Sequence, residues 1–225
     1  MTALISASAL RKTYSQGGER AVQTVALDDV DVTVNEGEML AIVGPSGSGK
    51  STLLHCLSGI ASPDAGTITL GNITLTGLDD DARSQLRATR FGFVFQGLNL
   101  LPALSVIENV ELATLLGGGT GKQAREASMS ALEQVGLADR AHAGVHELSG
   151  GEQQRVAVAR AVAHGPSVIW ADEPTGSLDS ASGEVVIGLL RDAVADGRSV
   201  VVVTHSDQVA AAADRVVRLA DGRVA

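Results

Sequence analysis

Eight consecutive residues in the first quarter of the chain have the types and spacing that bind a phosphate. They are Gly44-Pro45-Ser46-Gly47-Ser48-Gly49-Lys50-Ser51, and they fit the pattern G-x-x-x-x-G-K-S/T. The glycines let the backbone curl so that successive N–H groups point at one anion. Lys50 can then reach the β- and γ-phosphates of a nucleotide, and the Ser51 hydroxyl can hold Mg²⁺. The segment predicts a binding site for ATP or GTP.

The elements expected around this loop place it where a nucleotide can bind. Residues 39–43 form an apolar run of strand length, and Thr52 opens an apolar helix that runs to Leu57. The start of that helix adds about half a positive charge at the phosphate, and the first N–H groups, that of Thr52 included, point towards it. A flexible glycine-serine linker would not lie between a buried strand and an apolar helix.

A pair of acids at the end of a later strand supplies further candidates. The apolar residues 168–171 are followed directly by Asp172 and Glu173. At the carboxyl edge of a parallel sheet, Asp172 would lie beside the phosphate loop and orient Mg²⁺. Glu173 could polarise the water that attacks the γ-phosphate. The alternative is a pair of solvated loop acids, which is common for an isolated Asp-Glu pair.

The segment Ser149-Gly150-Gly151-Glu152 predicts a second helix start of unusual composition. Its S-x-x-E pattern is that of a capping box. Two glycines in a first helical turn cost conformational entropy, yet they would let a phosphate approach the exposed N–H groups closely. One nucleotide is not easily served by two such helix starts in one chain. We therefore infer that this second start reaches a nucleotide held by another copy of the chain.

The rest of the pattern predicts an α/β fold. Strand-like segments, several of them apolar or alternating, are expected at 4–10, 21–34, 67–70, 73–75, 91–95, 168–171, 200–203 and 215–219. Helical spacing is found at 107–116, 122–135 and 152–162. The early strands suit an antiparallel layer, and the later apolar strands suit a buried parallel sheet. We expect a nucleotide-binding core, an antiparallel β subdomain and a helical insert.

The composition of the 225 residues narrows the class of protein. With 44 % hydrophobic and 19 % charged residues, the chain is globular and large enough for one substantial core. No apolar run approaches the ~20 residues that span a bilayer, and no signal peptide is expected at the start. The single cysteine, Cys56, excludes an internal disulfide and suits the cytosol as a buried structural thiol. A net charge of −9 argues against a nucleic-acid partner.

Together these motifs resemble a known family. Residues 148–155 (LSGGEQQR) are similar to the signature of ATP-binding cassette (ABC) ATPases, and the resemblance covers nearly the whole chain. In order it includes Tyr14, the phosphate loop, Gln96, the signature, Asp172-Glu173, Ser177-Leu178-Asp179 and His205. Residues 95–102 and 172–179 resemble the subgroup of lipoprotein-release and macrolide-export ATPases. The resemblance implies one ABC ATPase domain over residues 1–225, a RecA-like P-loop NTPase core with a helical subdomain at about 97–162.

The resemblance also implies roles for the isolated candidates. Tyr14 would stack on adenine, and Gln96 would contact Mg²⁺ and the attacking water. His205 would contact the γ-phosphate, and Asp179 would cross the interface between two copies. Taken alone, Tyr14 could be a half-buried strand residue, Gln96 a loop residue and His205 a surface residue. Ser206, where the family usually has Asp, removes no group that the chemistry needs.

The function implied by the resemblance is Mg²⁺-dependent ATP hydrolysis that energises a membrane transporter. Two copies would hold ATP between them, with the Ser149–Gly151 segment of one chain completing the site of the other. The dimer would dock on transmembrane permease subunits at the cytoplasmic face of the inner membrane. The apolar segment that contains Leu98, Leu100, Leu101 and Leu104 would form part of the docking groove, unless these leucines are simply core.

Two other functions stay open at this point. A regulatory ABC switch of the cell-division type, which signals through a membrane partner, shares every motif. A soluble ABC ATPase of DNA repair or translation is disfavoured by the acidic balance and the lack of a long coiled-coil insert. Gly176-Ser177, where translation factors carry Asn-His, also argues against it.

Overall fold

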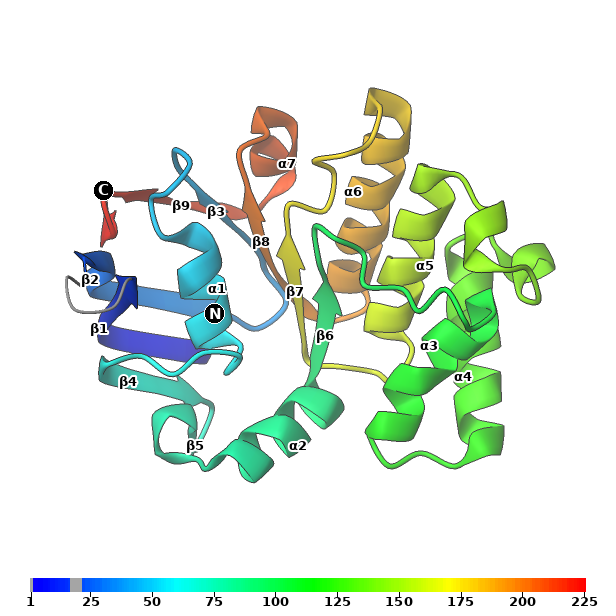
Figure 1. Ribbon diagram of the computed structural model, residues 1–225, viewed down its shortest axis with the longest axis horizontal. Helices are drawn as coiled ribbons and strands as arrows, with labels where there is room; N and C mark the ends of the chain where they lie inside the picture. Colours follow the sequence, from blue (N-terminus) through cyan, green and yellow to red (C-terminus); the bar gives the residue numbers. More distant parts are fainter. Residues whose placement is uncertain (1, 17–21) are drawn as a thin grey trace.

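The computed structural model describes residues 2–16 and 22–225, which form two β-sheets and a set of helices (Figure 1). The strands are β1 (Ala3–Gln16), β2 (Val22–Asn35), β3 (Met39–Val43), β4 (Ala65–Leu70), β5 (Ile73–Thr74), β6 (Phe91–Val94), β7 (Val168–Asp172), β8 (Ser199–Thr204), β9 (Arg215–Ala220) and β10 (Arg223–Val224). The α-helices are α1 (Lys50–Leu57), α2 (Asp80–Arg90), α3 (Val106–Leu116), α4 (Gly121–Gln134), α5 (Gly150–Val162), α6 (Ser180–Ala195) and α7 (Asp207–Ala212).

The topology of the described residues confirms the expected α/β organisation. Strands β9, β3, β8, β7 and β6 lie side by side and parallel, and β10 adds an antiparallel edge next to β9. The order β2-β1-β4-β5 forms a separate antiparallel sheet. Helices α3, α4 and α5 pack together at the opposite end of the molecule from that sheet (Figure 1).

The central strands β3, β7 and β8 are buried on both faces because they are apolar at nearly every position, whereas β9 is exposed on one face. Successive side chains of a strand point to opposite faces, so Leu40 and Trp170 enter one core and Met39 and Ala171 enter the other. The first core is closed by α1 and the antiparallel sheet, and the second by α3, α5, α6 and α7. Parallel strands covered on both sides are the arrangement that wholly apolar runs predict.

Several element bounds differ from the sequence-based expectation. Strand β1 continues to Gln16, beyond the expected end at residue 10, and Ala9 lies at a register shift with φ 52°. This irregularity explains why the alternation of β1 is broken in the sequence. Helix α1 begins at Lys50, two residues before the expected start, and the expected strand residue Phe95 lies beyond β6. Ala21, expected to open β2, is outside the described residues.

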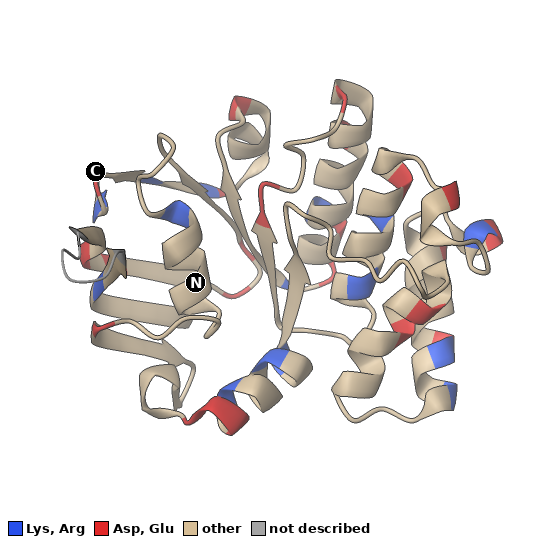
Figure 2. Cartoon of the chain, viewed as in Figure 1, with Lys and Arg blue, Asp and Glu red and all other residues tan. Residues whose placement is uncertain are grey.

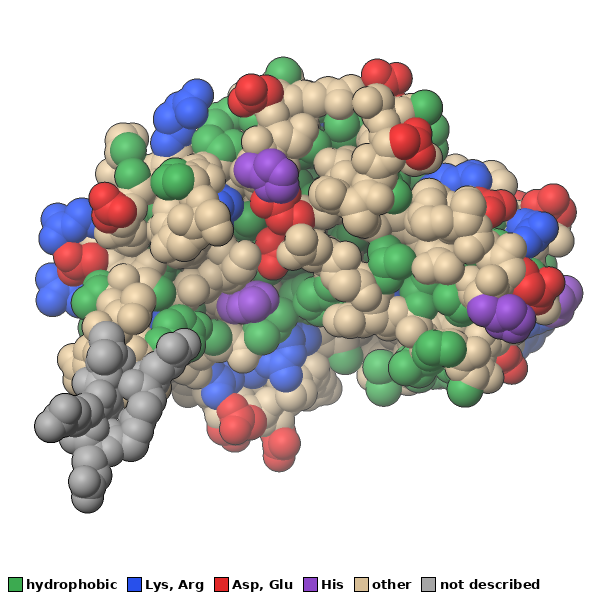
Figure 3. Space-filling view, turned by 45° about the horizontal axis from the view of Figure 1, so that its top comes forward, with side chains coloured by type: hydrophobic (Ala, Val, Ile, Leu, Met, Phe, Trp, Pro, Cys, Tyr) green, Lys and Arg blue, Asp and Glu red, His purple; other side chains and the backbone are tan. Residues whose placement is uncertain are grey.

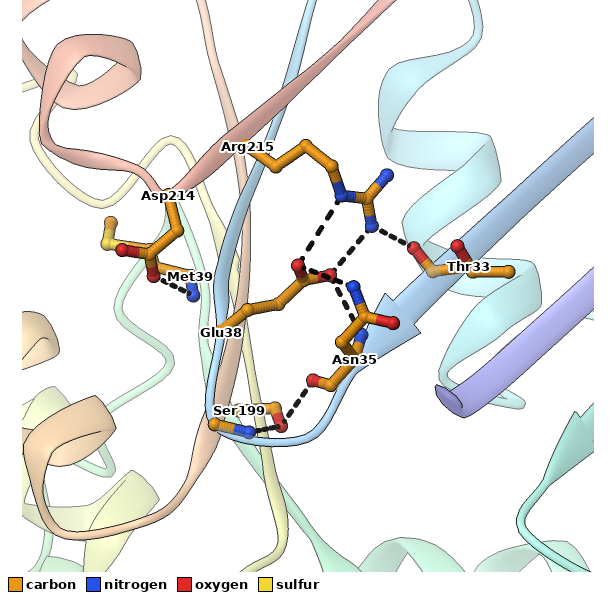
Figure 4. Close-up of polar contacts among 8 residues, drawn as sticks. Thr33, Asn35, Glu38, Met39, Ser199, Asp214 and Arg215 are labelled. Carbon is orange, nitrogen blue, oxygen red and sulfur yellow. Dashed lines mark hydrogen bonds and ion pairs between the residues drawn. The ribbon is translucent and has the colours of Figure 1, made fainter. Parts of the chain in front are cut away.

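At the amino ends of the central strands, a buried polar network joins three segments (Figure 4). The Glu38 carboxylate is almost fully buried; it accepts bonds from the Asn35 N–H and amide group at 2.8 and 2.9 Å and pairs with Arg215 at 2.7 Å. The Ser199 hydroxyl donates to the Asn35 carbonyl at 3.0 Å, and Asp214 accepts from the Met39 N–H at 2.7 Å. These bonds hold the amino end of β3 against the amino ends of β8 and β9.

Candidate functional site

The carboxyl ends of the parallel strands line up along the edge opposite to that network. Val43 of β3 pairs with Thr204 of β8, and Val203 pairs with Asp172 of β7. Every segment that leaves these strands therefore starts from the same edge, at the upper side of Figure 1. Figure 3 turns this edge towards the viewer and shows histidine and acidic side chains together near its middle.

The phosphate-binding loop leaves β3 at this edge and has the expected geometry. Gly49 has φ 99°, and a Cβ at this position would lie 2.2 Å from the Ala26 carbonyl oxygen, so only glycine fits. Helix α1 has no side-chain cap, in contrast to α2, which Asp79 caps. The first N–H groups of α1, those of Lys50, Ser51 and Thr52, have no acceptor within the helix. They remain available for a phosphate.

The Lys50 ammonium lies inside the loop and not in solvent. It is buried and donates to the carbonyl oxygens of Gly44 at 3.0 Å and Pro45 at 2.8 Å. Ser46 and Gly47 are exposed at the outer side of the loop, whereas Ser48 is buried beneath it. The loop therefore has the Lys50 ammonium at its centre, while its outer backbone is exposed to solvent.

Two oxygen groups beside the loop have the chemistry of a Mg²⁺ site. The Ser51 hydroxyl donates to the Asp172 carboxylate at 3.2 Å, so Asp172 lies beside the phosphate loop as expected. Burial raises the pKa of Asp172, because no cationic side chain pairs with it within the described residues. A hard divalent cation prefers such oxygen ligands, so the pair fits Mg²⁺. Gln96 is exposed just beyond β6, the neighbour of β7 at the same edge.

Glu173 and His205 form a contact that neither motif predicts by itself. The two side chains are joined by a 2.7 Å bond between His205 Nδ1 and Glu173 Oε1. Glu173 is only 14 % exposed, and it has the left-handed φ of 48°, which is uncommon for a residue other than glycine. Its N–H donates to the Val203 carbonyl at 2.9 Å, which holds this conformation. Backbone strain of this kind is often found at functional sites.

Tyr14 lies on β1 with 41 % of its surface exposed. The Lys12 ammonium is 5.6 Å from the centre of its ring, close enough for a cation–π contact. Lys12 pairs across the sheet with Leu27, whose side chain would lie 3.3 Å from a Cβ on Gly49 of the phosphate loop. The ring is thus an exposed aromatic surface on the strand that flanks the loop.

The second helix start has the predicted capping box. Ser149 accepts from the Glu152 N–H at 3.3 Å, and the Glu152 carboxylate accepts from the Ser149 N–H at 2.8 Å. The surroundings of its two glycines differ. A Cβ on Gly150 would meet nothing within 4 Å, whereas one on Gly151 would lie 2.8 Å from the Ser182 hydroxyl. Gly150 therefore leaves open space, while Gly151 allows close packing within the chain.

Asp179 is placed beside this second start. Its carboxylate caps α6, accepting from the Ser182 N–H at 3.0 Å and the Ser182 hydroxyl at 2.8 Å. These bonds lower the pKa of Asp179. The structure thus brings Asp179 and the Ser149–Gly151 turn together, but β7, β8 and α6 separate this turn from α1 (Figure 1).

Sequence reasoning missed three local features of the site. Ser182 contacts both Asp179 and Gly151, yet a serine in a helix gives no signal in the sequence. Arg160 of α5 donates to the carbonyls of Leu98 and Asn99, just beyond Gln96. Ser206 caps α7, a pattern that S/T/D/N before a short helix could have indicated.

Other candidates are excluded from this chemistry. Burial raises the pKa of the Cys56 thiol to about 11, so it remains protonated and unreactive. Among residues 2–16 and 22–225, no three His, Cys, Asp or Glu side chains gather as metal ligands, and no helix is long and apolar enough to cross a bilayer.

Comparison with protein families gives a match over most of the chain. A family model described as "ABC transporter" matches residues 27–176. The macrolide export ATP-binding/permease protein MacB of Burkholderia pseudomallei (strain 1710b) is 47 % identical over 207 residues, which cover 92 % of this chain and 31 % of that protein. MacB 1 of Yersinia pestis bv. Antiqua (strain Antiqua) is 44 % identical over 224 residues, 100 % of this chain and 34 % of that protein. The chain spans about a third of the length of these curated relatives.

Solved structures with the same fold are also similar in sequence. A dimeric bacterial ABC transporter cassette superposes with a TM-score of 0.89 at 41 % identity, covering 98 % of this chain and 96 % of that one. A dimeric post-hydrolysis state of an ATP-binding cassette, bound to ADP and Pi, gives the same TM-score at 40 % identity and the same coverage. The fold is that of an ABC cassette, as the motifs indicated.

Proposed function

We propose that this chain, which belongs to the ABC transporter family, hydrolyses ATP to energise a membrane transporter. Its resemblance to macrolide-export proteins favours the lipoprotein-release and macrolide-export subgroup. We further propose that residues 1–225 act as one ATPase domain with a helical subdomain at about 97–162, peripheral to the cytoplasmic face of the inner membrane.

The observation that carries this proposal is the gathering of Lys50, Ser51, Asp172, Glu173 and His205 at one edge of the sheet. Lys50 would bind the β- and γ-phosphates, and the loop N–H groups would hold the same anion. Glu173 would accept a proton from the attacking water. His205 holds the Glu173 carboxylate, and its 70 % exposed side chain can also reach a γ-phosphate.

The cofactors of this reaction would be ATP and Mg²⁺. Ser51, Asp172 and Gln96 would hold the metal, which neutralises charge on the phosphates. Tyr14 would stack on the adenine ring. The oxygen groups of Ser51 and Asp172 support the metal, and the exposed ring of Tyr14 supports the base.

A second copy of the chain would complete each site. The Ser149–Gly151 turn and Asp179 are separated from the phosphate loop of their own chain, and the space around a Cβ on Gly150 is open. The similar solved cassettes are dimeric, which supports the same assembly here. In it, Ser149, Gly150 and Gly151 would bind the γ-phosphate held by the partner, and Asp179 would lie at the interface.

The membrane partner would be a permease. The curated relatives are named ATP-binding/permease proteins and are about three times as long as this chain. A long cavity beside β6 offers a docking groove, with Phe93, Phe95 and Leu116 among its lining. Leu98, Leu100, Leu101 and Leu104 do not line this cavity, and Leu100 packs against the core.

Complementation between two inactive variants tests the shared site. Lys50→Ala removes the loop cation, and Gly150→Glu adds a negative charge at the second start, where a Cβ meets no atom within 4 Å. Each variant alone should lose ATPase activity. Their mixture should regain it, since one site of the mixed dimer contains an intact Lys50 and an intact Gly150. A mixture that remains inactive would place the whole site in one chain and contradict the proposal.

A variant that traps the ATP-bound state gives an independent test of the dimer. Glu173→Gln should bind Mg²⁺-ATP and form a dimer that light scattering detects, because it slows cleavage and not binding. The wild-type ATPase rate should rise more steeply than protein concentration at low concentration. A Glu173→Gln chain that stays monomeric at saturating Mg²⁺-ATP would contradict the dimer.

A further inference from the structure

Gln96 is an exposed residue in the segment that joins β6 to α3. Val94, the last residue of β6, pairs with Ala171, which directly precedes Asp172. Gln96 therefore leaves the sheet at the edge where the metal site is proposed. An exposed loop side chain has little packing of its own, so its position depends on how the backbone on either side of it is held.

Two consecutive residues just beyond Gln96 have an uncommon backbone conformation. Leu98 and Asn99 have left-handed φ values of 57° and 51°. Residues other than glycine rarely adopt this region, and a leucine is especially unfavourable there because its Cβ crowds the backbone. Such a conformation persists only where the surrounding structure fixes it. The contacts that stabilise this turn therefore have to come from other elements.

Arg160 of α5 makes such contacts to both residues. One terminal nitrogen of its guanidinium donates to the Leu98 carbonyl at 2.7 Å, and the other donates to the Asn99 carbonyl at 2.6 Å. Burial lowers the pKa of Arg160, and no carboxylate of the described chain offsets that effect. A partly buried cation is thus used to hold two backbone carbonyl groups.

A favourable charge at the end of α5 does not account for these contacts. Arg160 lies in the last turn of α5, where a cation interacts well with the helix dipole. Figure 2 shows basic ribbon there and acidic ribbon near the first turn of the same helix. That interaction does not depend on where the guanidinium donates. Here it donates away from its own helix, to the green segment that passes over α5 in Figure 1.

The strand before Gln96 is attached to the same part of the molecule. The Phe91 carbonyl contacts His164 Nε2, just beyond α5, at 3.1 Å. A Cβ on Gly92 would lie 2.0 Å from the Ala161 carbonyl oxygen, so the backbone of β6 lies directly against α5. The end of α5 thus holds the chain before Gln96 as well as after it.

The rest of the segment is held by Asn109 of α3. This buried amide accepts from the Leu101 N–H at 2.7 Å and donates to the Leu101 carbonyl at 3.1 Å. It also donates to the carbonyls of Leu104 at 3.3 Å and Ser105 at 3.0 Å. Polar side chains of two helices therefore fix the backbone that follows Gln96.

We propose that Arg160 is a positioning residue for the metal site, because its bonds to two loop carbonyls hold Gln96 where its side chain reaches the Mg²⁺. The inference rests on the proposed function, since it requires Gln96 to be a ligand of that metal. Groups that orient a metal ligand are often as important for affinity as the ligand itself. Without Arg160 the turn would leave its left-handed conformation, and the Gln96 side chain would no longer be directed to one place.

The test measures metal binding and not turnover. Mn²⁺ replaces Mg²⁺, and electron paramagnetic resonance counts the free ion in the presence of the β,γ-imido analogue of ATP. Gln96→Ala and Arg160→Gln should each weaken Mn²⁺ binding by about tenfold, as the loss of an orienting group does in other metal sites. Affinity for ATP in EDTA should stay at the wild-type value in Arg160→Gln, because Lys50 and the loop N–H groups are unchanged.

The double variant separates positioning from a general structural role. If Arg160 acts through Gln96, the chain with both Gln96→Ala and Arg160→Gln should bind Mn²⁺ as weakly as Gln96→Ala alone. A general loss of structure would add to the effect of Gln96→Ala and weaken binding further. Arg160→Lys keeps the charge but not the two-pronged geometry, so it should recover part of the affinity. It also replaces Arg160→Gln in the comparison if that variant does not fold.

Hydrogen exchange gives a measurement without metal or nucleotide. Amide exchange of residues 97–101 should be about tenfold faster in Arg160→Gln, because two charge-assisted bonds are lost. Arg87→Gln is the matched control, since Arg87 also donates to a backbone carbonyl, that of Gly59, but not to this segment. It should change neither the exchange of residues 97–101 nor the affinity for Mn²⁺.

Three results would overturn this inference while leaving the proposed function in place: wild-type Mn²⁺ affinity in Arg160→Gln, unchanged exchange of residues 97–101 in that variant, or weaker binding by the double variant than by Gln96→Ala. Unchanged Mn²⁺ affinity in Gln96→Ala would instead remove Gln96 from the proposed metal site, and this inference with it. A wild-type chain that shows the expected Mn²⁺ results but hydrolyses no ATP would reject the proposed function alone.

Discussion

The two ends of the same parallel strands hold their charged side chains in different ways. At the amino ends, Glu38 has three hydrogen-bonding or ionic partners, and Asp214 is paired with Arg191 and the Met39 N–H. At the carboxyl ends, Asp172 has a single hydroxyl partner, although it too is partly buried. At the amino ends the charged side chains are paired in a polar network, whereas at the carboxyl ends Asp172 is only partly compensated by its neighbours.

The pKa directions follow this difference. Burial alone would raise the pKa of Glu38, but bonds from Arg215 and Asn35 bring it below its ordinary value. The pKa of Asp214 is lowered by Arg191 and by the Met39 N–H. Burial raises the pKa of Asp172, against the weaker effect of its Ser51 bond. The amino end therefore stabilises the fold, whereas the carboxyl end holds groups suited to a ligand that brings its own charge.

The largest effect is expected from Lys50→Ala at the carboxyl end. Lys50 contacts only two loop carbonyls within the described chain, so the fold should tolerate its loss. Nucleotide affinity should fall about 100-fold, since a cation on the phosphates is removed. Titration with a fluorescent ATP analogue measures this, and urea unfolding should show little change. If Lys50→Ala binds ATP normally, the difference between the two ends of the strands has no bearing on nucleotide binding.

The converse result is expected for Glu38→Gln at the amino end. Removing this carboxylate leaves Arg215 without its buried partner and should reduce the free energy of unfolding by about 2 kcal/mol. Nucleotide affinity should not change. The exposed neighbour Glu36 supplies the control, because Glu36→Gln should stay within about 0.5 kcal/mol of the wild type in urea unfolding. Weaker ATP binding by Glu38→Gln would show that the two ends are coupled.

Acid should destabilise the fold through the carboxylates at the amino ends of the parallel strands. Because the pKa values of Glu38 and Asp214 are lowered by folding, their contribution is complete above the unfolded values of about 4 and is lost as the pH falls below them. Wild-type stability should therefore decline more steeply than that of Glu38→Gln below about pH 4. Urea titrations from pH 7 to pH 3 measure both slopes. Parallel curves would mean that Glu38 does not contribute to acid sensitivity.

Sequence patterns predicted those features whose partners are close in the chain or fixed by sheet topology. The Ser149–Glu152 capping box is local, and the position of Asp172 beside the phosphate loop follows because β3, which precedes the loop, and β7 end at the same edge of a parallel sheet. The family resemblance supplied the rest of the expected site. Roles that depend on a nucleotide or a second chain remain predictions.

Contacts between distant side chains that no motif marks could not be predicted. Glu38 and Arg215 are separated by 177 residues, and Glu173 and His205 by 32, and neither pair has a sequence pattern of its own. The same holds for Gly151 and Ser182, which meet because α5 packs against α6. Such contacts depend on strand register and helix packing, which single residues do not reveal.

The smallest expected effect is at Asp172. Its raised pKa means that the charged form is disfavoured in the fold, so any contribution to stability is present below about pH 4 and is lost as the pH rises through the folded value. Asp172→Asn should therefore be more stable than the wild type at pH 7, by about 0.5 kcal/mol, and the difference should vanish in acid. Mg²⁺-ATP should reverse the order, because a bound ligand stabilises the form that holds it more tightly. Thermal unfolding with and without Mg²⁺-ATP measures both. An Asp172→Asn chain that is less stable than the wild type without ligand would mean that the carboxyl end, like the amino end, is built for stability.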